Sequence, residues 1–478
     1  MSGTGSTGYI GGLIGRNTSG NIQTATVKGN TSGTNYTGGL IGENASSSAT
    51  IASVTVEGNV TGTGTTGYVG GLIGLNASKN MTNATVTGNT TGVLYVGGLI
   101  GKNNSTSYTF STLKVTGDVE GTGTGGYVGG LIGQNYGIIT GAEYAGNVYG
   151  IGSFLGGLIG KQESGEINTS KTSGQVIMKY SSSNYNSTKQ NAGGLVGYNN
   201  GQTISKCYSS SDVLVGESTT KWSYIGGLVG NNYRPGKIEK SAATGDVTAN
   251  TTDCSYIGGL VGYNYGTADS NGNRALVENS YSTGKVAGGT YVGGLIGYTQ
   301  YGQITNSYTV SRVTGYTTGG LIGDVYSTVT SGSTRNWTTV TNSYWTKEQS
   351  GQSSSKLGTV KTVTWLINRR NLTNVWDMEE TWGIDDRKSL PYINGITVPN
   401  EVYVVDNGYV TYAEGDGTQS NPYIITTEGE LRRMADVKNA YYRLEADIEL
   451  TGVSGEGSSN WTAVGNSSEY FYRTLRWK

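Results

Sequence analysis

The side chains best suited to acid–base or metal chemistry are few and scattered along this chain. Histidine, the commonest general base and a frequent zinc ligand, is absent. The carboxylates Asp118, Asp212, Asp246 and Asp324 fall in different copies of a sequence repeat, each beside a turn. A polysaccharide lyase or hydrolase gathers its charged groups in one groove, and a calcium loop spaces its acids closely. We therefore expect no catalytic residue, no metal site and no cofactor.

The two cysteines and the overall charge exclude further classes of function. Cys207 and Cys254 occupy different positions of the repeat. A disulfide between them is one interpretation, and two isolated thiols that fill space is the simpler one. The net charge is −1, with Lys and Arg spread along the chain, so nucleic acid is not expected as a partner. No apolar run of 18 residues occurs, so we expect no membrane insertion.

Tyrosine is the residue type with the clearest potential for binding. Six tyrosines lie on or next to a position of the repeat that we expect to face solvent. They are Tyr198, Tyr233, Tyr263, Tyr265, Tyr298 and Tyr301. Exposed, stiff aromatic rings can stack on sugars or anchor a protein partner at low entropic cost. The alternative is a structural ladder of rings that only covers the edges of the repeats.

These tyrosines are positioned by a repeat in which Gly-Gly-Leu-Ile/Val-Gly occurs eleven times, at intervals of 26 to 37 residues. Its leucines are Leu13, Leu40, Leu72, Leu99, Leu131, Leu158, Leu195, Leu228, Leu260, Leu295 and Leu321. With 81 glycines and 34% hydrophobic residues, the composition alone resembles a disordered chain. The period indicates instead a stack of coils that share one core, that is, a parallel β-solenoid of about eleven coils.

Comparison of the copies separates buried from exposed positions. An aromatic residue lies four positions before the Leu in nine copies, and a β-branched residue always follows the Leu, so both are expected in the core or in stacking ladders. The third position after the Leu varies freely, from Arg16 to Asp324, and is expected to face solvent. Asn occupies the next position in eight copies, which predicts a corner with a ladder of amides and a left-handed backbone. The Gly pair predicts a close approach between backbones rather than a phosphate loop.

The residues 256–264, Tyr-Ile-Gly-Gly-Leu-Val-Gly-Tyr-Asn, and the partner strand 279–286 resemble the GLUG-motif repeats of bacterial surface proteins and adhesins. The resemblance covers roughly residues 8–345. It implies a β-solenoid on a secreted or surface-attached bacterial protein, with no catalytic activity in the repeats.

Beyond the repeats we expect three further segments. Residues 346–395, rich in Trp, resemble a closing cap for the open end of the solenoid. Residues 396–412 are expected to form a linker or edge strand. Residues 413–478 resemble the N-terminal cap of a second, truncated solenoid, with a helix over about 428–437 that Thr427 and Glu430 open as a capping box. The end at 471–478 departs from the pattern that the resemblance implies, but one back-translation of it that loses a single base encodes Phe-Thr-Gly-His-Phe-Asp-Gly, which fits that pattern. We interpret this match as a one-base frameshift near Phe471, and the alternative is that codon degeneracy produced the match by chance.

Two functions stay open. The first is a non-enzymatic adhesin that binds a host protein, a matrix protein or a glycan through one face of the solenoid. The second is a passive stalk that presents a further terminal domain. A polysaccharide-processing β-helix enzyme is a less favoured third. The expected location is the bacterial cell surface, with export signal and anchor outside this stretch of sequence.

Overall fold

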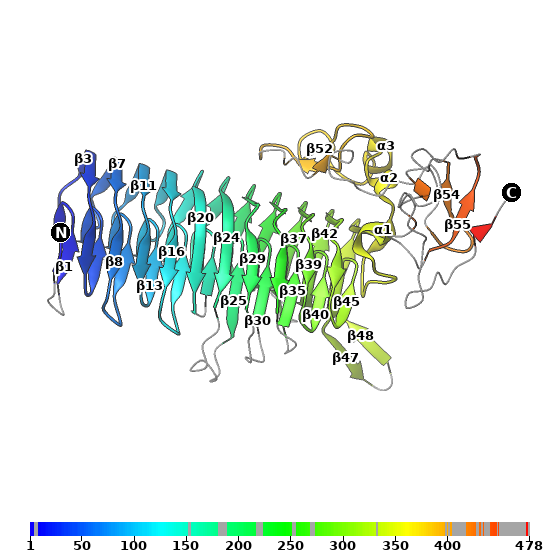
Figure 1. Cartoon of the computed structure of the whole chain (residues 1–478), viewed down its shortest axis with the longest axis horizontal. Coiled ribbons are helices and arrows are strands. Elements are labelled where there is room, and N and C mark those ends of the chain that lie inside the picture. Colours follow the sequence, from blue (N-terminus) through cyan, green and yellow to red (C-terminus); the bar gives the residue numbers. More distant parts are fainter. Residues whose placement is uncertain are drawn as a thin grey trace, which may run out of the picture.

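The computed structural model describes residues 1–3, 8–151, 154–179, 189–216, 223–250, 255–267, 273–330, 333–396, 399, 402–403, 417–426, 430–431, 434, 440–446, 448 and 475–476. Its main body is a parallel β-solenoid (Figure 1), and two of its three large sheets contain eleven strands each. The expected fold class and the eleven coils are therefore confirmed. We number the coils 1 to 11 in the order of their leucines, from Leu13 to Leu321.

Each coil contributes one strand to the first sheet, one to the second, and one or more short strands to the third. The first sheet comprises β1 Tyr9–Gly11, β5 Tyr36–Gly38, β9 Tyr68–Gly70, β13 Tyr95–Gly97, β17 Tyr127–Gly129, β21 Phe154–Gly156, β25 Gln190–Gly193, β30 Ser223–Gly226, β35 Ser255–Gly258, β40 Tyr291–Gly293 and β45 Thr317–Gly319. The second comprises β2 Ile14–Asn17, β6 Ile41–Asn44, β10 Ile73–Asn76, β14 Ile100–Asn103, β18 Ile132–Asn135, β22 Ile159–Gln162, β26 Val196–Asn200, β31 Val229–Tyr233, β36 Val261–Tyr265, β41 Ile296–Gln300 and β46 Ile322–Val325.

The third sheet closes each coil on its remaining side. In coils 1 to 6 it comprises β3 Ile22–Lys28, β4 Thr31–Gly33, β7 Thr50–Glu57, β8 Val60–Gly62, β11 Asn80–Thr87, β12 Thr90–Gly92, β15 Thr109–Thr116, β16 Val119–Gly121, β19 Ile138–Thr140, β20 Glu143–Gly150, β23 Ile167–Asn168 and β24 Lys171–Met178. From coil 7 it comprises β27 Thr203–Ser205, β28 Tyr208–Ser209, β29 Asp212–Val215, β32 Lys237–Glu239, β33 Ala242–Ala243, β34 Val247–Ala249, β37 Ala275–Glu278, β38 Tyr281–Ser282, β39 Val286–Ala287, β42 Gly302–Thr305, β43 Tyr308–Thr309, β44 Val313–Thr314, β49 Thr339–Thr341, β50 Tyr344–Thr346 and β51 Thr359–Lys361. A hairpin of β47 Ser327–Thr330 and β48 Ser333–Asn336 projects from coil 11 (Figure 1).

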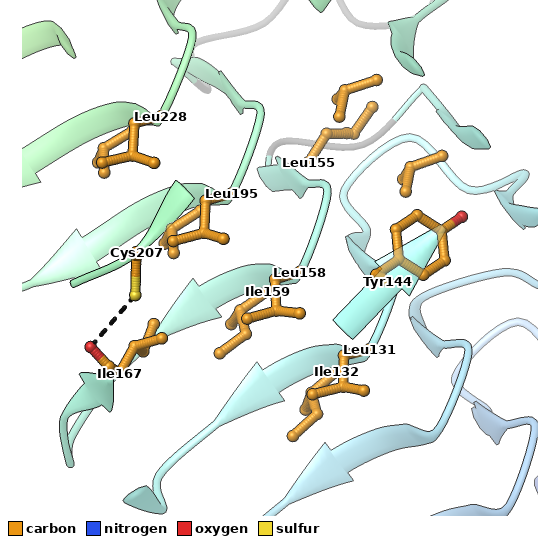
Figure 2. Packing of buried hydrophobic residues seen from close by; sticks show 14 of the residues in the cluster. Leu131, Ile132, Tyr144, Leu155, Leu158, Ile159, Ile167, Leu195, Cys207 and Leu228 are labelled. Carbon is orange, nitrogen blue, oxygen red and sulfur yellow. Dashed lines mark hydrogen bonds between the residues drawn. The ribbon is translucent and has the colours of Figure 1, made fainter. Parts of the chain in front are cut away.

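The core is one file of aliphatic side chains that runs through the stack, as Figure 2 shows for Leu131, Leu158, Leu195 and Leu228. Ten of the eleven repeat leucines are fully buried, and only Leu13, in the first coil, is 55% exposed. The β-branched residue after each Leu points into the same core, so this expectation is confirmed. Cys207 is a free, buried thiol that packs here, and burial raises its pKa to about 12. Cys254 lies outside the described residues.

The Gly pair makes the tight connection between the first and second sheets, as predicted. A Cβ on Gly11 would lie 2.0 Å from Ile14 O, and one on Gly12 would lie 2.2 Å from Gly39 O of the next coil. No side chain fits in this space. Only glycine therefore lets the chain turn back on itself and stack on the next coil.

The expected amide ladder is present, but its backbone conformation is not left-handed. Asn17 Nδ2 donates to Asn44 Oδ1 at 2.9 Å, and Asn44 Nδ2 donates to Asn76 Oδ1 at 3.0 Å. The ladder continues through Asn103 and Asn135, and a second stretch links Asn199, Asn232 and Asn264. These residues lie in strands of the second sheet, and none of them has a positive φ. The corner arises instead because the side chain bonds the turn that follows, as when Asn17 Oδ1 accepts from Gly20 N.

The segment expected to cap the solenoid closes its end and also covers its side. Trp345 packs in the solenoid core, and Gly320 N donates to Ser354 O, so residues near 354 close coil 11. The chain then forms α1 Lys347–Ser350, α2 Val363–Leu366, α3 Arg369–Leu372 and the antiparallel pair β52 Trp382–Gly383 and β53 Tyr392–Ile393. Residues 362–396 and 402–403 fold back along the third sheet (Figure 1), and we call them the lateral subdomain.

The lateral subdomain is held by aromatic contacts on the outside of the coils. Trp382 packs against Tyr281 and Tyr308, and its Nε1 donates to Asn279 Oδ1 at 3.2 Å. Val402, expected in a linker, belongs to the same buried cluster. The sequence predicted an end cap because the tryptophans follow the last coil. In the structure, outward tyrosines on coils 9 to 11 form a lateral face on which these tryptophans pack.

The C-terminal unit has its own small core around Tyr423, Ile425 and Tyr442. Its parallel strands are β54 Tyr423–Ile425, β55 Tyr442–Leu444 and β56 Leu475–Arg476. Of the expected helix 428–437, only 430–431 and 434 are described, and 430–431 are helical. Thr427 lies outside the described residues, and Glu430 Oε2 accepts hydrogen bonds from Thr426 N and Oγ1.

Candidate ligand-binding surface

The aromatic residues of the first sheet form a continuous ladder over coils 1 to 6. Consecutive rings from Tyr9 to Phe154 have centroids 4.8 to 5.3 Å apart and interplanar angles of 2 to 34°. Such stacked pairs stabilise beyond their buried area. Because each ring covers the face of the next, this part of the ladder offers a ligand mainly ring edges and hydroxyls.

The last glycine of the repeat motif, two positions after the Leu, lets the second sheet lie close to the first sheet, which carries this ladder. A Cβ on Gly42 would lie 2.6 Å from Ile10 N and 2.9 Å from Tyr36 O, both in the first sheet. The variable third position after each Leu therefore lies beside the ladder. Arg16 lies 5.3 Å from the Tyr9 ring centroid, and Lys102 lies 5.5 Å from that of Tyr95.

This neighbourhood corrects the expectation that the third position faces solvent. Gln134 and Asn231 are buried there, and Arg16 alone among the eleven is classed as exposed; the others are half-buried. Lys102 is partly buried, and this desolvation lowers its pKa. The sequence varies at this position because the ladder accepts cations, amides and rings alike, and not because the position is free of contacts.

The tyrosines of coils 7 to 10 form a broader patch. Coil 7 carries Asn191 where the ladder needs an aromatic ring, and Phe154 contacts Tyr198 of the second sheet instead, at 5.5 Å. Tyr198 stacks on Tyr233 at 5.8 Å, and Tyr233 stacks on Tyr265 at 5.0 Å.

The rings of the patch occupy three columns of the repeat, which lie four positions before the Leu, three positions after it and five positions after it. Tyr263 lies 4.8 Å from Tyr224 at an interplanar angle of 44°, and 5.2 Å from Tyr256 at 64°. Tyr298 stacks on Tyr256 at 4.5 Å and lies at 62° to Tyr291. We define the tyrosine patch by these residues: Tyr198, Tyr224, Tyr233, Tyr256, Tyr263, Tyr265, Tyr291 and Tyr298. Its steeply tilted rings do not all cover one another's faces, in contrast to the ladder of coils 1 to 6.

Five of the six predicted tyrosines thus come together, and Tyr301 stands to one side. Tyr301 contacts Tyr326 at 5.5 Å and Trp337 at 6.1 Å. All six are half-buried rather than fully exposed. Tyr224, Tyr256 and Tyr291 were expected only as ladder residues, yet they are three of the eight rings of the patch, and Tyr224 and Tyr256 are buried in it. Tyr136, five positions after its Leu like Tyr233 and Tyr265, was overlooked although the same spacing marks it.

Burial raises the pKa of several phenol groups of the patch. Desolvation raises the pKa of Tyr298 to about 12 and raises those of Tyr198 and Tyr263 further. The Tyr263 hydroxyl donates to Gln300 Oε1 at 3.0 Å. At physiological pH the patch therefore presents apolar ring surface and neutral hydroxyl groups, which suit polar, uncharged ligand groups.

The four aspartates considered for catalysis have structural partners. Asp118 Oδ1 accepts from Asn147 N, Asp212 Oδ1 from Asp246 N, and Asp246 Oδ1 from Lys285 N, each one coil further on. Asp324 lies 3.1 Å from Lys356 Nζ. Among the described residues no group of three His, Cys, Asp or Glu side chains could hold a metal ion.

The fold and this surface define a class, the parallel β-solenoid with an external aromatic ladder. The family model of the GLUG motif matches residues 223–248, 253–287 and 288–314, so the chain contains GLUG-motif repeats in coils 8 to 10. These coils carry most of the tyrosine patch. No curated protein and no solved structure matches the chain. In the part of the chain that the structure describes, no helix is both long and apolar enough to cross a membrane.

Proposed function

We propose that this protein is a non-enzymatic repeat protein of the bacterial cell surface that binds a host protein, a matrix protein or a glycan through the tyrosine patch. The observation that carries this proposal is the change in ring geometry at coil 7. Before it, stacked rings cover one another. After it, several ring pairs are tilted by 44 to 64°. Tyr224 and Tyr256 are buried, and the half-buried rings are the part of the patch that a ligand can reach: Tyr198, Tyr233, Tyr263, Tyr265, Tyr291 and Tyr298.

The chemistry of the patch supports a partner of this kind. Tyrosine gives a large, stiff contact area with two side-chain torsions to fix, and its hydroxyl satisfies polar groups at the contact. Repetition along the solenoid places the rings at regular steps, which suits a ligand that itself repeats. The GLUG repeats support the surface location, since the resemblance noted above is to bacterial surface proteins.

The test compares alanine variants in the patch with one in the stacked ladder. Tyr263→Ala and Tyr298→Ala should reduce binding to host cells or to a glycan array by about tenfold or more, since each removes a central ring. Tyr95→Ala, with a ladder ring on each side, is the matched control and should keep wild-type binding. Circular dichroism confirms that each variant is folded. Unchanged binding by both patch variants would rule out the patch as the ligand site.

A passive stalk is the second candidate, and the continuous stacking over coils 1 to 6 favours it. A ladder of rings and a ladder of amides along the same coils stiffen the solenoid without offering a site. If the solenoid is a stalk, removal of coils 3 and 4 should shorten the distance at which it holds a terminal domain. The binding activity of that domain should not change. Loss of binding on mutation of the tyrosine patch is the result that separates the two candidates.

A further inference from the structure

A second surface, on the third sheet, carries an unassigned recess. One outward column of this sheet runs in register through Glu143, Lys171, Tyr208, Ala242, Tyr281, Tyr308 and Tyr344. The lateral subdomain covers the tyrosine end of the column, where Tyr308 OH donates to Pro391 O. Towards the N-terminus the column continues beyond the subdomain as Tyr208, Lys171 and Glu143.

The recess lies where the subdomain ends on this column. It has a volume of about 220 Å³, with Gly395 and Ile396 of the subdomain on one side and coils 5 to 7 on the other. Ligand sites form preferentially at junctions between such units. The volume is below the usual range for drug-sized ligands, so the recess suits a single small ring or the last residue of a longer chain.

The charges around the recess favour an anion. Lys171 Nζ lies 3.6 Å from Glu143 Oε1, a long ion pair between half-exposed groups. Lys206 is exposed and makes no ion pair with any described residue. Two lysines against one glutamate leave the lining with a net positive charge.

The uncharged part of the lining favours a polyol. Thr169 offers a hydroxyl at the rim, and Tyr208 offers a ring held in place by its hydroxyl, which is 2.8 Å from Thr244 Oγ1. A fixed aromatic ring beside hydroxyl and ammonium groups matches the two sides of a sugar, one apolar and one rich in hydroxyls.

We propose that this recess binds one anionic sugar residue, with its carboxylate near Lys171 and Lys206 and its ring against Tyr208. The site is independent of the tyrosine patch, which lies on the first and second sheets. Because the contacts are solvent-exposed, the affinity should be weak and should fall as salt is added.

The structure supplies a matched pair of variants for the test. Lys206 and Lys240 occupy the same corner in consecutive coils, with φ of 52° and 47°, and only Lys206 lines the recess. Asn occupies this corner at 279, 306 and 342, so Lys→Asn is compatible with the left-handed backbone. Lys206→Asn therefore tests the site, and Lys240→Asn tests charge alone.

The experiment titrates the full chain with sodium glucuronate, with methyl glucoside as the neutral sugar and with sodium acetate as the anion without a sugar. We expect saturable binding of glucuronate only, weakened about fivefold by Lys206→Asn and unchanged by Lys240→Asn. Three results would overturn the proposal: no saturable glucuronate binding, equal binding of acetate or methyl glucoside, or equal losses in the two variants. A folded state of each variant is checked by its circular dichroism spectrum.

Discussion

Phe154 and Tyr198 meet edge to face, with ring centroids 5.5 Å apart and an interplanar angle of 81°, and they join two different aromatic files. The amide ladder changes at the same place. Asn135 donates to Gln162 Oε1, but Gln162 Nε2 turns to the carbonyls of Ser164 and Gly165. Both ladders therefore change between coils 6 and 7. The solenoid is built from two sub-arrays that share a core but differ in their outer surface.

The buried amide ladder should stabilise the solenoid measurably. Asn76 accepts from Asn44 Nδ2 and Ser78 N and donates to Asn103 Oδ1, so Asn76→Ala removes three hydrogen bonds and leaves two buried donors without their acceptor. We expect a loss of about 2 kcal/mol or more in equilibrium urea unfolding. Asn59→Ala is the control. Its Oδ1 accepts from Asn89 N at the exposed surface, where water can replace it, and the expected loss is under about 1 kcal/mol. Equal losses would contradict a stabilising role for the ladder.

The approach between the first and second sheets should tolerate no side chain. In Gly101→Ala the new Cβ would lie 2.6 Å from Val69 N and 2.7 Å from Gly74 O, both backbone atoms. We expect a loss of about 3 kcal/mol or more, or failure to fold. Gly125→Ala has open space around its Cβ and should unfold like the wild type. Thermal unfolding followed by circular dichroism compares the two, and a stable Gly101→Ala would show that the sheets can separate at little cost.

The lateral subdomain should loosen independently of the solenoid. Trp382 is fully buried and stacks on Trp376 at 4.6 Å, so Trp382→Ala should cost about 3–5 kcal/mol within this unit. Limited proteolysis should then cut within residues 362–396 while the coils stay intact. Trp365→Ala, at a half-buried position, should increase cleavage less. Cleavage spread over the coils of Trp382→Ala would indicate that the subdomain and the solenoid unfold together.

The sequence predicted the repeat architecture well because one period places every core residue. The leucine file, the β-branched neighbours, the Gly pair and the amide ladder all follow from comparing eleven copies. Two features could not be predicted in this way. The contact between Tyr263 and Tyr256 depends on how closely two sheets approach across a glycine, and the docking of Trp382 on Tyr281 joins residues from different structural units. Neither distance is encoded in the period of the repeat.

A buried carboxylate at the end of the solenoid should make the stability of that region depend on pH. Glu348 is 4% exposed, and its oxygens accept from Val363 N, at the start of α2, and from Tyr423 OH of the C-terminal unit. Burial outweighs these hydrogen bonds and raises its pKa to about 7. The folded protein therefore binds more protons than the unfolded chain between the ordinary pKa of glutamate and about 7, and stability should fall as pH rises through this range.

Glu348→Gln removes this titration. Its amide oxygen can accept from Val363 N, and its amide nitrogen can donate to the Tyr423 hydroxyl oxygen. The unfolding midpoint of the wild type should therefore fall relative to that of Glu348→Gln as the pH rises from 4.5 to 7. Above pH 7 the difference between the two midpoints should stay constant. Glu379→Gln, at an exposed position of the lateral subdomain, controls for the general effect of removing a carboxylate. Tyr423→Phe removes one donor to the charged form, so it should raise the pKa of Glu348 further and extend the fall in stability to higher pH. A wild type and a Glu348→Gln variant with parallel pH profiles would show that folding does not raise the pKa of Glu348.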